Sequence, residues 1–242
     1  MSIGHVVKRR YILTLGGAGI VGSLGGGVVT AGILQAHTGS PVQGSPTQNN
    51  GPYLKPGTFD QQFLAKPADV KQIWDFSALE QVLSEGFIPI KNAMNAFQFV
   101  YQKSFYPVIC LRGPVVVYAL DDTMWGKYRL SSVYDQQANT TENQNPLYHR
   151  ITTGSGTLKP DDPNSPYQDP SLQALLQRGL SLAVCHDALN GLSVQLAKQH
   201  GPTAQAVFAD LATHLISGAQ QTPSGSSLIA VAQHLGFTYA KP

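Results

Sequence analysis

Charged residues and cysteines are scarce in this sequence, and each shortage excludes a class of protein. Only 12% of the 242 residues are charged, about half of ordinary usage, and Lys plus Arg number 16 against 14 for Asp plus Glu. A net charge of +2 gives no basic field of the kind that nucleic-acid-binding proteins carry. Two cysteines exclude a disulfide framework. Because 42% of the residues are hydrophobic, the chain can build a packed core and is not disordered as a whole.

The N-terminus lacks acidic residues before Asp60, and its first basic residues form one cluster, Lys8, Arg9 and Arg10. Residues 11–34 then run for 24 positions without a charge, enough at ~1.5 Å per residue for a helix across a ~30 Å bilayer core. Eight of these 24 residues are glycine, which lowers both helix propensity and hydrophobicity. The sequence KRRYILT at residues 8–14 resembles the twin-arginine export signal, in which paired arginines precede apolar residues.

This resemblance implies export of a folded protein from a bacterial or archaeal cytoplasm, so we expect a periplasmic or other extracytoplasmic location. A plain membrane anchor with a positive cytoplasmic flank is the alternative, and the chain would then stay attached to the membrane. Residues 1–36 are therefore interpreted as a signal or membrane anchor. Residues 37–57 are rich in Gly, Pro, Ser, Thr, Gln and Asn and bury too little apolar surface to order themselves. We expect residues 37–70 to be a flexible tether.

From residue 71 onward the pattern alternates between strands and helices. Strand candidates are residues 71–76, 107–111, 180–185 and 237–239, with a short strand and turn at 220–223. Ser77 is expected to cap the helix that follows it, and further helical patterns cover 89–101, 171–179, 188–200, 203–217 and 226–235. Residues 115–120 are either a further strand or the start of a crossover. Strands separated by helices predict an α/β domain over residues 71–242, with a mostly parallel sheet covered on both faces. Residues 131–170, rich in polar residues and proline, are expected to be an irregular excursion.

Cys185 is the candidate for chemistry, because it follows an apolar strand and precedes a helix that opens near His186. Ligand crevices of open parallel sheets lie beyond the carboxyl ends of the strands. Unpaired N–H groups at a helix N-terminus favour a thiolate, and His186 could add positive charge or shuttle a proton. The plainer interpretation, in which Cys185 is a small buried hydrophobic residue, stays open.

Three stretches of the sequence resemble the DsrE/DsrF-like sulfur-relay family. The sequence GLSLAVCHDAL at residues 179–189 has the family's glycine, apolar strand, cysteine and following helix. Residues 90–97 are similar to its first helix, and residues 223–225 with 232–239 are similar to its C-terminal helix and strand. Together they extend over residues 71–242, with the 131–170 excursion outside the match.

The resemblance implies a single flavodoxin-like α/β domain of a kind that usually assembles into homo-oligomers. We expect no cofactor and no metal. In active members the cysteine at the position of Cys185 carries sulfur as a persulfide and passes it to a thiol of a partner protein. We therefore predict an exported sulfane-sulfur carrier or sulfurtransferase, with Cys185 as the persulfide carrier and His186 as a modulator. The alternative is a non-catalytic binding or assembly subunit of a membrane-associated complex with the same fold. A small-ligand or nucleotide binder is a third interpretation, which rests on the crevice of the fold alone.

The second thiol, Cys110, lies within the predicted strand 107–111. If the strand order follows the flavodoxin pattern 2-1-3, the strands of Cys110 and Cys185 flank the first strand. They are then ~10 Å apart, beyond the ~7 Å limit for a disulfide. We expect Cys110 to be a reduced core residue.

Other polar residues carry weaker signals. His149 and His200, even together with Cys185 and His186, lack the spacing of a known zinc or haem site, so solvated histidines are expected. The adjacent carboxylates of residues 121–122 are interpreted as a helix cap rather than a catalytic pair.

Overall fold

A computed structural model describes Leu54, Phe59 and residues 61–131, 143–151 and 158–242 of the chain. The predicted signal or anchor at residues 1–36, and the first part of the predicted tether, lie outside these described residues. No helix in the described ranges is both long and apolar enough to cross a membrane.

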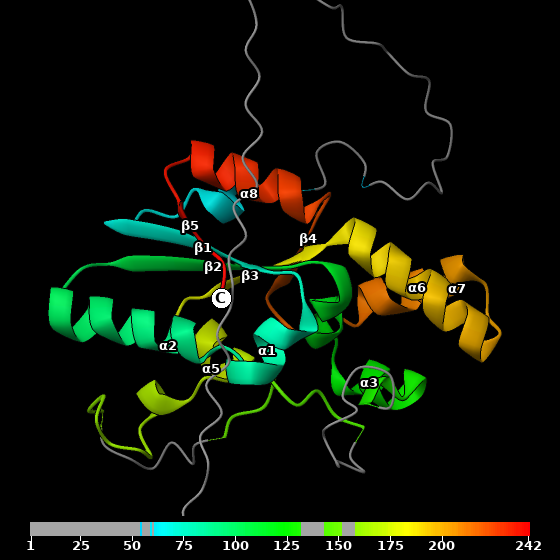
Figure 1. Ribbon diagram of the computed structural model, residues 1–242, viewed down its shortest axis with the longest axis horizontal. Coiled ribbons are helices and arrows are strands. Elements are labelled where there is room, and N and C mark those ends of the chain that lie inside the picture. Colours follow the sequence, from blue (N-terminus) through cyan, green and yellow to red (C-terminus); the bar gives the residue numbers. More distant parts are fainter. Residues whose placement is uncertain (1–53, 55–58, 60, 132–142, 152–157) are drawn as a thin grey trace, which may run out of the picture. The chain divides into compact units, whose positions relative to one another are not determined.

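A parallel sheet of five strands forms the centre of the domain (Figure 1). All four neighbouring pairs run parallel, as the alternation of strands and helices predicts. The α/β class with a parallel sheet is therefore confirmed. The strands are β1 (Val70–Phe76), β2 (Phe105–Leu111), β3 (Ser181–Cys185), β4 (Ala219–Thr222) and β5 (Thr238–Ala240), in the order β4-β3-β2-β1-β5.

This strand order corrects one expectation. The 2-1-3 arrangement would separate β2 from β3 by β1, but β2 pairs directly with both β1 and β3. Each of β2, β3 and β4 is added beside the strand before it, and only β5 crosses to the free edge of β1. Hydrophobic periodicity identifies a crossover but not the side on which the next strand is added, so the sequence left the order undetermined.

Helices cover both faces of the sheet (Figure 1). One face carries η1 (Gln61–Leu64) and α8 (Gly225–His234), which pack on one apolar cluster with the strands. The elements whose buried residues form the other apolar cluster are α1 (Leu79–Glu85), α2 (Ile88–Asn95), η3 (Gly113–Ala119), α3 (Asp122–Tyr128), α5 (Leu172–Gln177), α6 (His186–His200) and α7 (Ala204–Thr213). The π-helical turn η2 (Ala96–Tyr101) continues α2, and the short turn η4 (Pro166–Gln168) precedes α5.

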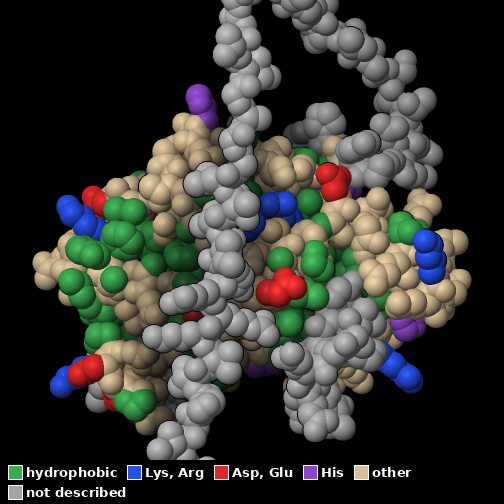
Figure 2. Space-filling view, viewed as in Figure 1, with side chains coloured by type: hydrophobic (Ala, Val, Ile, Leu, Met, Phe, Trp, Pro, Cys, Tyr) green, Lys and Arg blue, Asp and Glu red, His purple; other side chains and the backbone are tan. Residues whose placement is uncertain are grey.

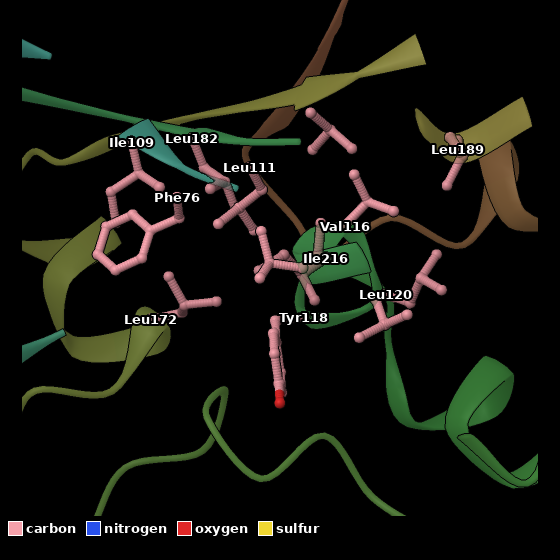
Figure 3. Packing of buried hydrophobic residues seen from close by; sticks show 14 of the residues in the cluster. Phe76, Ile109, Leu111, Val116, Tyr118, Leu120, Leu172, Leu182, Leu189 and Ile216 are labelled. Atoms are coloured by element: carbon pink, nitrogen blue, oxygen red, sulfur yellow. The ribbon is translucent and has the colours of Figure 1, made fainter. Parts of the chain in front are cut away.

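Strand β2 shows how the two clusters share the sheet. Successive side chains of a strand point to opposite faces, and Val108 and Cys110 belong to the cluster under α8, whereas Ile109 and Leu111 belong to the other. Figure 3 shows the second cluster, in which Leu111 and Leu182 from the sheet pack above η3. The central strands are buried on both faces, which explains their continuous apolar runs.

Residues 115–120, expected to be a strand or the start of a crossover, are not a strand. Residues 115–119 are buried within the 3-10 helix η3. Gly113 has φ of +61°, and Pro114 follows it as the first turn opens, so the chain bends sharply after β2. A short, fully buried apolar run gives the same sequence pattern in a strand and in a helix.

Two predicted helix starts are confirmed and one is wrong: the N-cap of α1 is Ala78 rather than Ser77. Asp121 is the N-cap of α3, where its Oδ1 accepts a hydrogen bond of 3.1 Å from the backbone N–H of Met124. Pro89 lies in the first turn of α2, where its missing N–H costs no intrahelical bond.

The end of the predicted tether packs against the domain. Phe63 and Leu64 are buried under the same face as α8. The Tyr106 hydroxyl donates a hydrogen bond to the backbone carbonyl of Phe63 and accepts another, of 2.8 Å, from the Ser181 hydroxyl. The packed domain thus begins before Val70, because Phe63 and Leu64 are apolar enough to join the core although the residues before them are mostly polar.

Parts of the 131–170 excursion are fixed by buried polar side chains. The Asn145 amide, 1% exposed, donates hydrogen bonds of 2.8 Å to the carbonyls of both Tyr118 and Leu120. Its Oδ1 accepts a bond from the N–H of Leu147. Asp169, fully buried, accepts from the N–H groups of Ile151 and Ser171. The side chains of Asn145 and Asp169 therefore attach these described parts of the excursion to backbone groups of the domain.

Candidate functional site

Cys185 lies where the sequence predicts it, at the junction of a central strand and a helix. It is the last residue of β3 and the N-cap of the 15-residue helix α6. The register pairs Cys185 with Thr222, the last residue of β4, and Val184 with Leu111, the last residue of β2. The thiol is thus at the carboxyl edge of the sheet, next to the ends of two other strands.

The surroundings of Cys185 are largely apolar. The residue is 6% exposed and belongs to the cluster that contains Val184 and Leu189. Its side chain makes no capping hydrogen bond to the first turn of α6. Among the described residues, the hollows beside β4, beside α8, beside α1 and at the Asp75–Arg112 pair have other linings and do not include Cys185.

His186 follows Cys185 but is held by other partners. Its Nδ1 lies 3.1 Å from Gln221 Oε1, and its ring packs edge-on against Phe208 with 4.8 Å between the ring centroids. Because an amide carbonyl oxygen accepts hydrogen bonds, Nδ1 carries the proton in this contact. His186 is 5% exposed, so the structure places it between β4 and α7 rather than in solvent.

The two thiols do not form a disulfide, although their strands are neighbours. Both cysteines are free and buried. The register pairs Cys110 with Ala183, two residues before Cys185. A strand spacing of ~4.8 Å and an offset of ~6.6 Å along the strand put the two Cα atoms ~8 Å apart, beyond the ~7 Å limit. The expectation of a reduced Cys110 in the core is confirmed, but the reason is this diagonal offset rather than an intervening strand.

Cys110 is chemically quiet in this environment. The residue is 0% exposed, and its thiol donates a weak hydrogen bond of 3.7 Å to the carbonyl of Gly225. Burial raises the pKa of Cys110 to about 12, and the charge of Asp75 and the proximity of Cys185 act in the same direction. The thiol therefore stays protonated at neutral pH.

The same edge of the sheet holds an ion pair that sequence reasoning missed. Asp75 on β1 is 1% exposed and receives two hydrogen bonds from Arg112, which follows β2, and one of 2.9 Å from the hydroxyl of Tyr239 on β5. These side chains, with Ser226 and Gln233 of α8, line an open hollow of about 360 Å³. The position of Arg112 directly after an apolar strand could have indicated a charged group at this edge. Its partner Asp75, and Tyr239 beside that carboxylate, come from distant parts of the sequence and could not be inferred from spacing.

Gly225 allows α8 to begin directly against this pair. A Cβ atom added to Gly225 would lie 2.9 Å from Arg112 Cδ and 3.0 Å from Cys110 Sγ. Only a residue without a side chain fits there. The glycine therefore sets how closely the start of α8 approaches the ends of β1 and β2.

The histidines considered as metal ligands are dispersed. His149 Nε2 lies 2.7 Å from Asp122 Oδ2, whereas the ring of His200 packs against Tyr128. No group of three or more His, Cys, Asp or Glu residues within the described ranges could hold a metal ion. Figure 2 shows charged side chains scattered over the face in view rather than gathered into a field of one sign.

The domain thus belongs to the class of α/β proteins with a parallel sheet and a set of polar and sulfur-bearing side chains at its carboxyl edge. In comparisons with known proteins, no family model matches the chain and no curated protein matches it.

Proposed function

We propose that this chain is an exported DsrE-like protein that carries sulfane sulfur as a persulfide on Cys185. The observation that supports this proposal is the position of Cys185 as the N-cap of α6 at the carboxyl end of β3. Persulfide chemistry needs an anionic sulfur, and the unpaired N–H groups in the first turn of a helix stabilise negative charge at this position. The sequence GLSLAVCHDAL, which resembles the family's cysteine motif, occupies this strand and the start of this helix.

The transfer needs no cofactor, and its atoms balance. The Cys185 thiolate attacks the sulfane sulfur of a donor such as thiosulfate, a bond forms between the two sulfurs, and sulfite leaves with the electron pair of the broken S–S bond. A thiolate of the acceptor then attacks the outer sulfur of the Cys185 persulfide. That step releases the Cys185 thiolate and leaves the persulfide on the acceptor. A thiol-bearing protein is the proposed acceptor.

His186 would modulate this reaction through its position rather than by proton transfer. Its Nδ1 is hydrogen-bonded to Gln221 and its ring packs against Phe208, so these two contacts fix the imidazole beside the first turn of α6. A protonated His186 would add positive charge near the end of β3 and stabilise the anionic sulfur.

A second candidate function is a non-catalytic binding or assembly subunit with the same fold. Two observations favour it: Cys185 is only 6% exposed, and the hollow at this edge is lined by Asp75, Arg112 and Tyr239 rather than by the thiol. Assembly into a homo-oligomer, and attachment to a membrane through residues 1–36, are proposals that fit either function.

Intact mass spectrometry separates the two functions. The purified full chain is incubated with thiosulfate or polysulfide, beside the variants Cys185→Ser and Cys110→Ser. We expect the wild-type chain and Cys110→Ser to gain one sulfur atom that cyanide removes as thiocyanate, and Cys185→Ser to gain none. If no form gains sulfur, or if Cys185→Ser gains it as readily as the wild type, sulfur carriage on Cys185 is wrong and the binding subunit is favoured.

A further inference from the structure

Two cations, one buried and one partly buried, lie together on the face of the domain away from Cys110. Lys91 lies on α2 and is 9% exposed, and Arg178 follows α5. Both reach the turn η4: the Lys91 ammonium donates a hydrogen bond of 2.8 Å to Gln168 Oε1, and the Arg178 guanidinium lies 4.9 Å from the ring centroid of Tyr167. Consecutive residues of one turn therefore cover both positive groups.

Asn95 connects these elements. It is four residues after Lys91, so both side chains lie on the same side of α2. Its Oδ1 accepts a hydrogen bond of 2.7 Å from Arg178 Nη2, and its Nδ2 donates one of 2.9 Å to the carbonyl of Tyr167. These hydrogen bonds thus join α2, η4 and the end of α5 around the two cations.

The hydrogen-bonding capacity of Arg178 is not used up. Its Nε and Nη1 are buried and have no hydrogen-bond partner within the described residues. None of the ion pairs formed by those residues includes Lys91 or Arg178. A charge shielded from water without a counter-charge is costly, and the unmade hydrogen bonds of buried N–H groups add to the cost.

Electrostatics agree with this geometry. Burial lowers the pKa of Lys91, and the nearby charge of Arg178 lowers it further. Burial also lowers the pKa of Arg178. Two neighbouring cations without an acidic partner are the arrangement that an anion would relieve.

We propose that Lys91 and Arg178 form a binding site for a small oxyanion beneath the Pro166–Gln168 turn. A tetrahedral anion such as phosphate or sulfate presents several acceptors, which would pair with the free N–H groups of Arg178 and with the Lys91 ammonium. The turn is the cover of this site, because Tyr167 and Gln168 lie against the two cations. The site is separate from Cys185 and does not depend on the sulfur chemistry proposed above.

Thermal unfolding of the full chain with millimolar sulfate or phosphate tests this site. Ionic strength is held constant with chloride, because sulfate and phosphate stabilise most folded proteins at high concentration. In the wild type we expect a saturable rise in Tm of about 3–6 °C at ten times Kd. Isothermal titration calorimetry with the same anions gives an independent Kd.

Variants locate the site. Arg178→Gln and Lys91→Gln should each weaken binding by about tenfold or more, because each removes charge-assisted hydrogen bonds. Lys198→Gln, a change of the same kind at an exposed position of α6, should leave the Kd unchanged. If Arg178→Gln does not fold, Arg178→Lys keeps the charge and should retain weakened binding.

Two outcomes would overturn the proposal. Sulfate and phosphate could give no more stabilisation than chloride in the wild type, or the rise could be equal in the wild type, Lys91→Gln and Lys198→Gln. In both cases Lys91 and Arg178 serve only to fasten the η4 turn to α2.

Discussion

Asp75 and Arg112 form a bidentate ion pair at the carboxyl edge of the sheet, with 2.7 Å from Nε to Oδ1 and 2.8 Å from Nη2 to Oδ2. The carboxylate is 1% exposed, whereas the Arg112 side chain is 33% exposed. The pair joins the ends of β1 and β2 just below the start of α8. The pair therefore connects two strands and also supplies the charged groups that line the hollow at this edge.

Replacing Asp75 with Asn should destabilise the domain in a pH-dependent way. Burial acts to raise the pKa of Asp75, but the hydrogen bonds from Arg112 and Tyr239 outweigh it and hold the pKa below its ordinary value. The resulting stability is present above pH ~4 and is lost as the pH falls through the lower pKa of the folded state. At neutral pH we expect Asp75→Asn to lower the free energy of unfolding by about 1–3 kcal/mol, since Arg112 is partly solvated.

Urea unfolding of wild type and Asp75→Asn between pH ~7 and pH ~3 checks this expectation. The gap between the two proteins should narrow as the pH falls. Asp161→Asn, at an exposed position, is the control and should have little effect. A gap that stays constant with pH would show that the ion pair contributes no titratable stability.

Gly225→Ala should be destabilising because of contact, not backbone conformation. The added methyl would lie 2.9–3.0 Å from atoms of Arg112 and Cys110, so α8 or these side chains must shift, at a cost of about 1–3 kcal/mol. Gly191→Ala on α6 is a matched control, since a Cβ there has no atom within 4 Å, and it should stabilise the protein by about 0.5–1 kcal/mol. Chemical denaturation measures both.

The double variant Gly225→Ala/Cys110→Ala should recover part of the loss, because the smaller side chain makes room for the methyl. Purely additive effects would mean that Cys110 is not the group that the methyl displaces.

The Cys110 thiol should make the free energy of unfolding depend on pH in the alkaline range. Burial raises its pKa to about 12 from an unfolded value of about 9, so the folded state retains a proton that the unfolded state has released. Stability from this group is complete below pH ~9 and is lost as the pH rises toward ~12, by at most about 4 kcal/mol. Wild type should therefore approach Cys110→Ala in stability as the pH is raised, and parallel pH profiles of the two proteins would contradict this expectation.

Asn145→Ala should release the excursion from the domain. The substitution leaves the buried carbonyls of Tyr118 and Leu120 without their donor and should cost about 2–4 kcal/mol. Limited proteolysis should cut near residues 143–151 faster than in the wild type. Asn164→Ala, at an exposed position, serves as the control, and equal cleavage of both variants would mean that Asn145 does not fasten this segment.

Most of the fold could be predicted from the sequence, because its elements have strong local signals. Pro89 opens α2, Asp121 caps α3, and β2 and β3 are continuous apolar runs between polar residues. Two features could not be predicted. The buried run at residues 115–119 has no periodicity that separates a 3-10 helix from a strand, and the position of β2 beside β3 depends on tertiary packing.

For the candidate site, the position of Cys185 was predictable but its surroundings were not. A strand followed by a helix places a residue at the carboxyl edge whatever the remaining contacts are. The burial of Cys185 and the partners of His186 depend on Gln221 and Phe208, which reach the site from β4 and α7. Side chains that meet only in the folded state leave no spacing signal in the sequence.

The pairing of β1 with β5 has a consequence for biosynthesis. Gln72 on β1 is the register partner of Thr238 on β5, and every other element of the sheet lies between them in the sequence. The ribosome therefore makes β1 long before β5, and one side of β1 has no strand beside it during that interval. A chain truncated before Thr238 would keep this β1 edge exposed and open to aggregation.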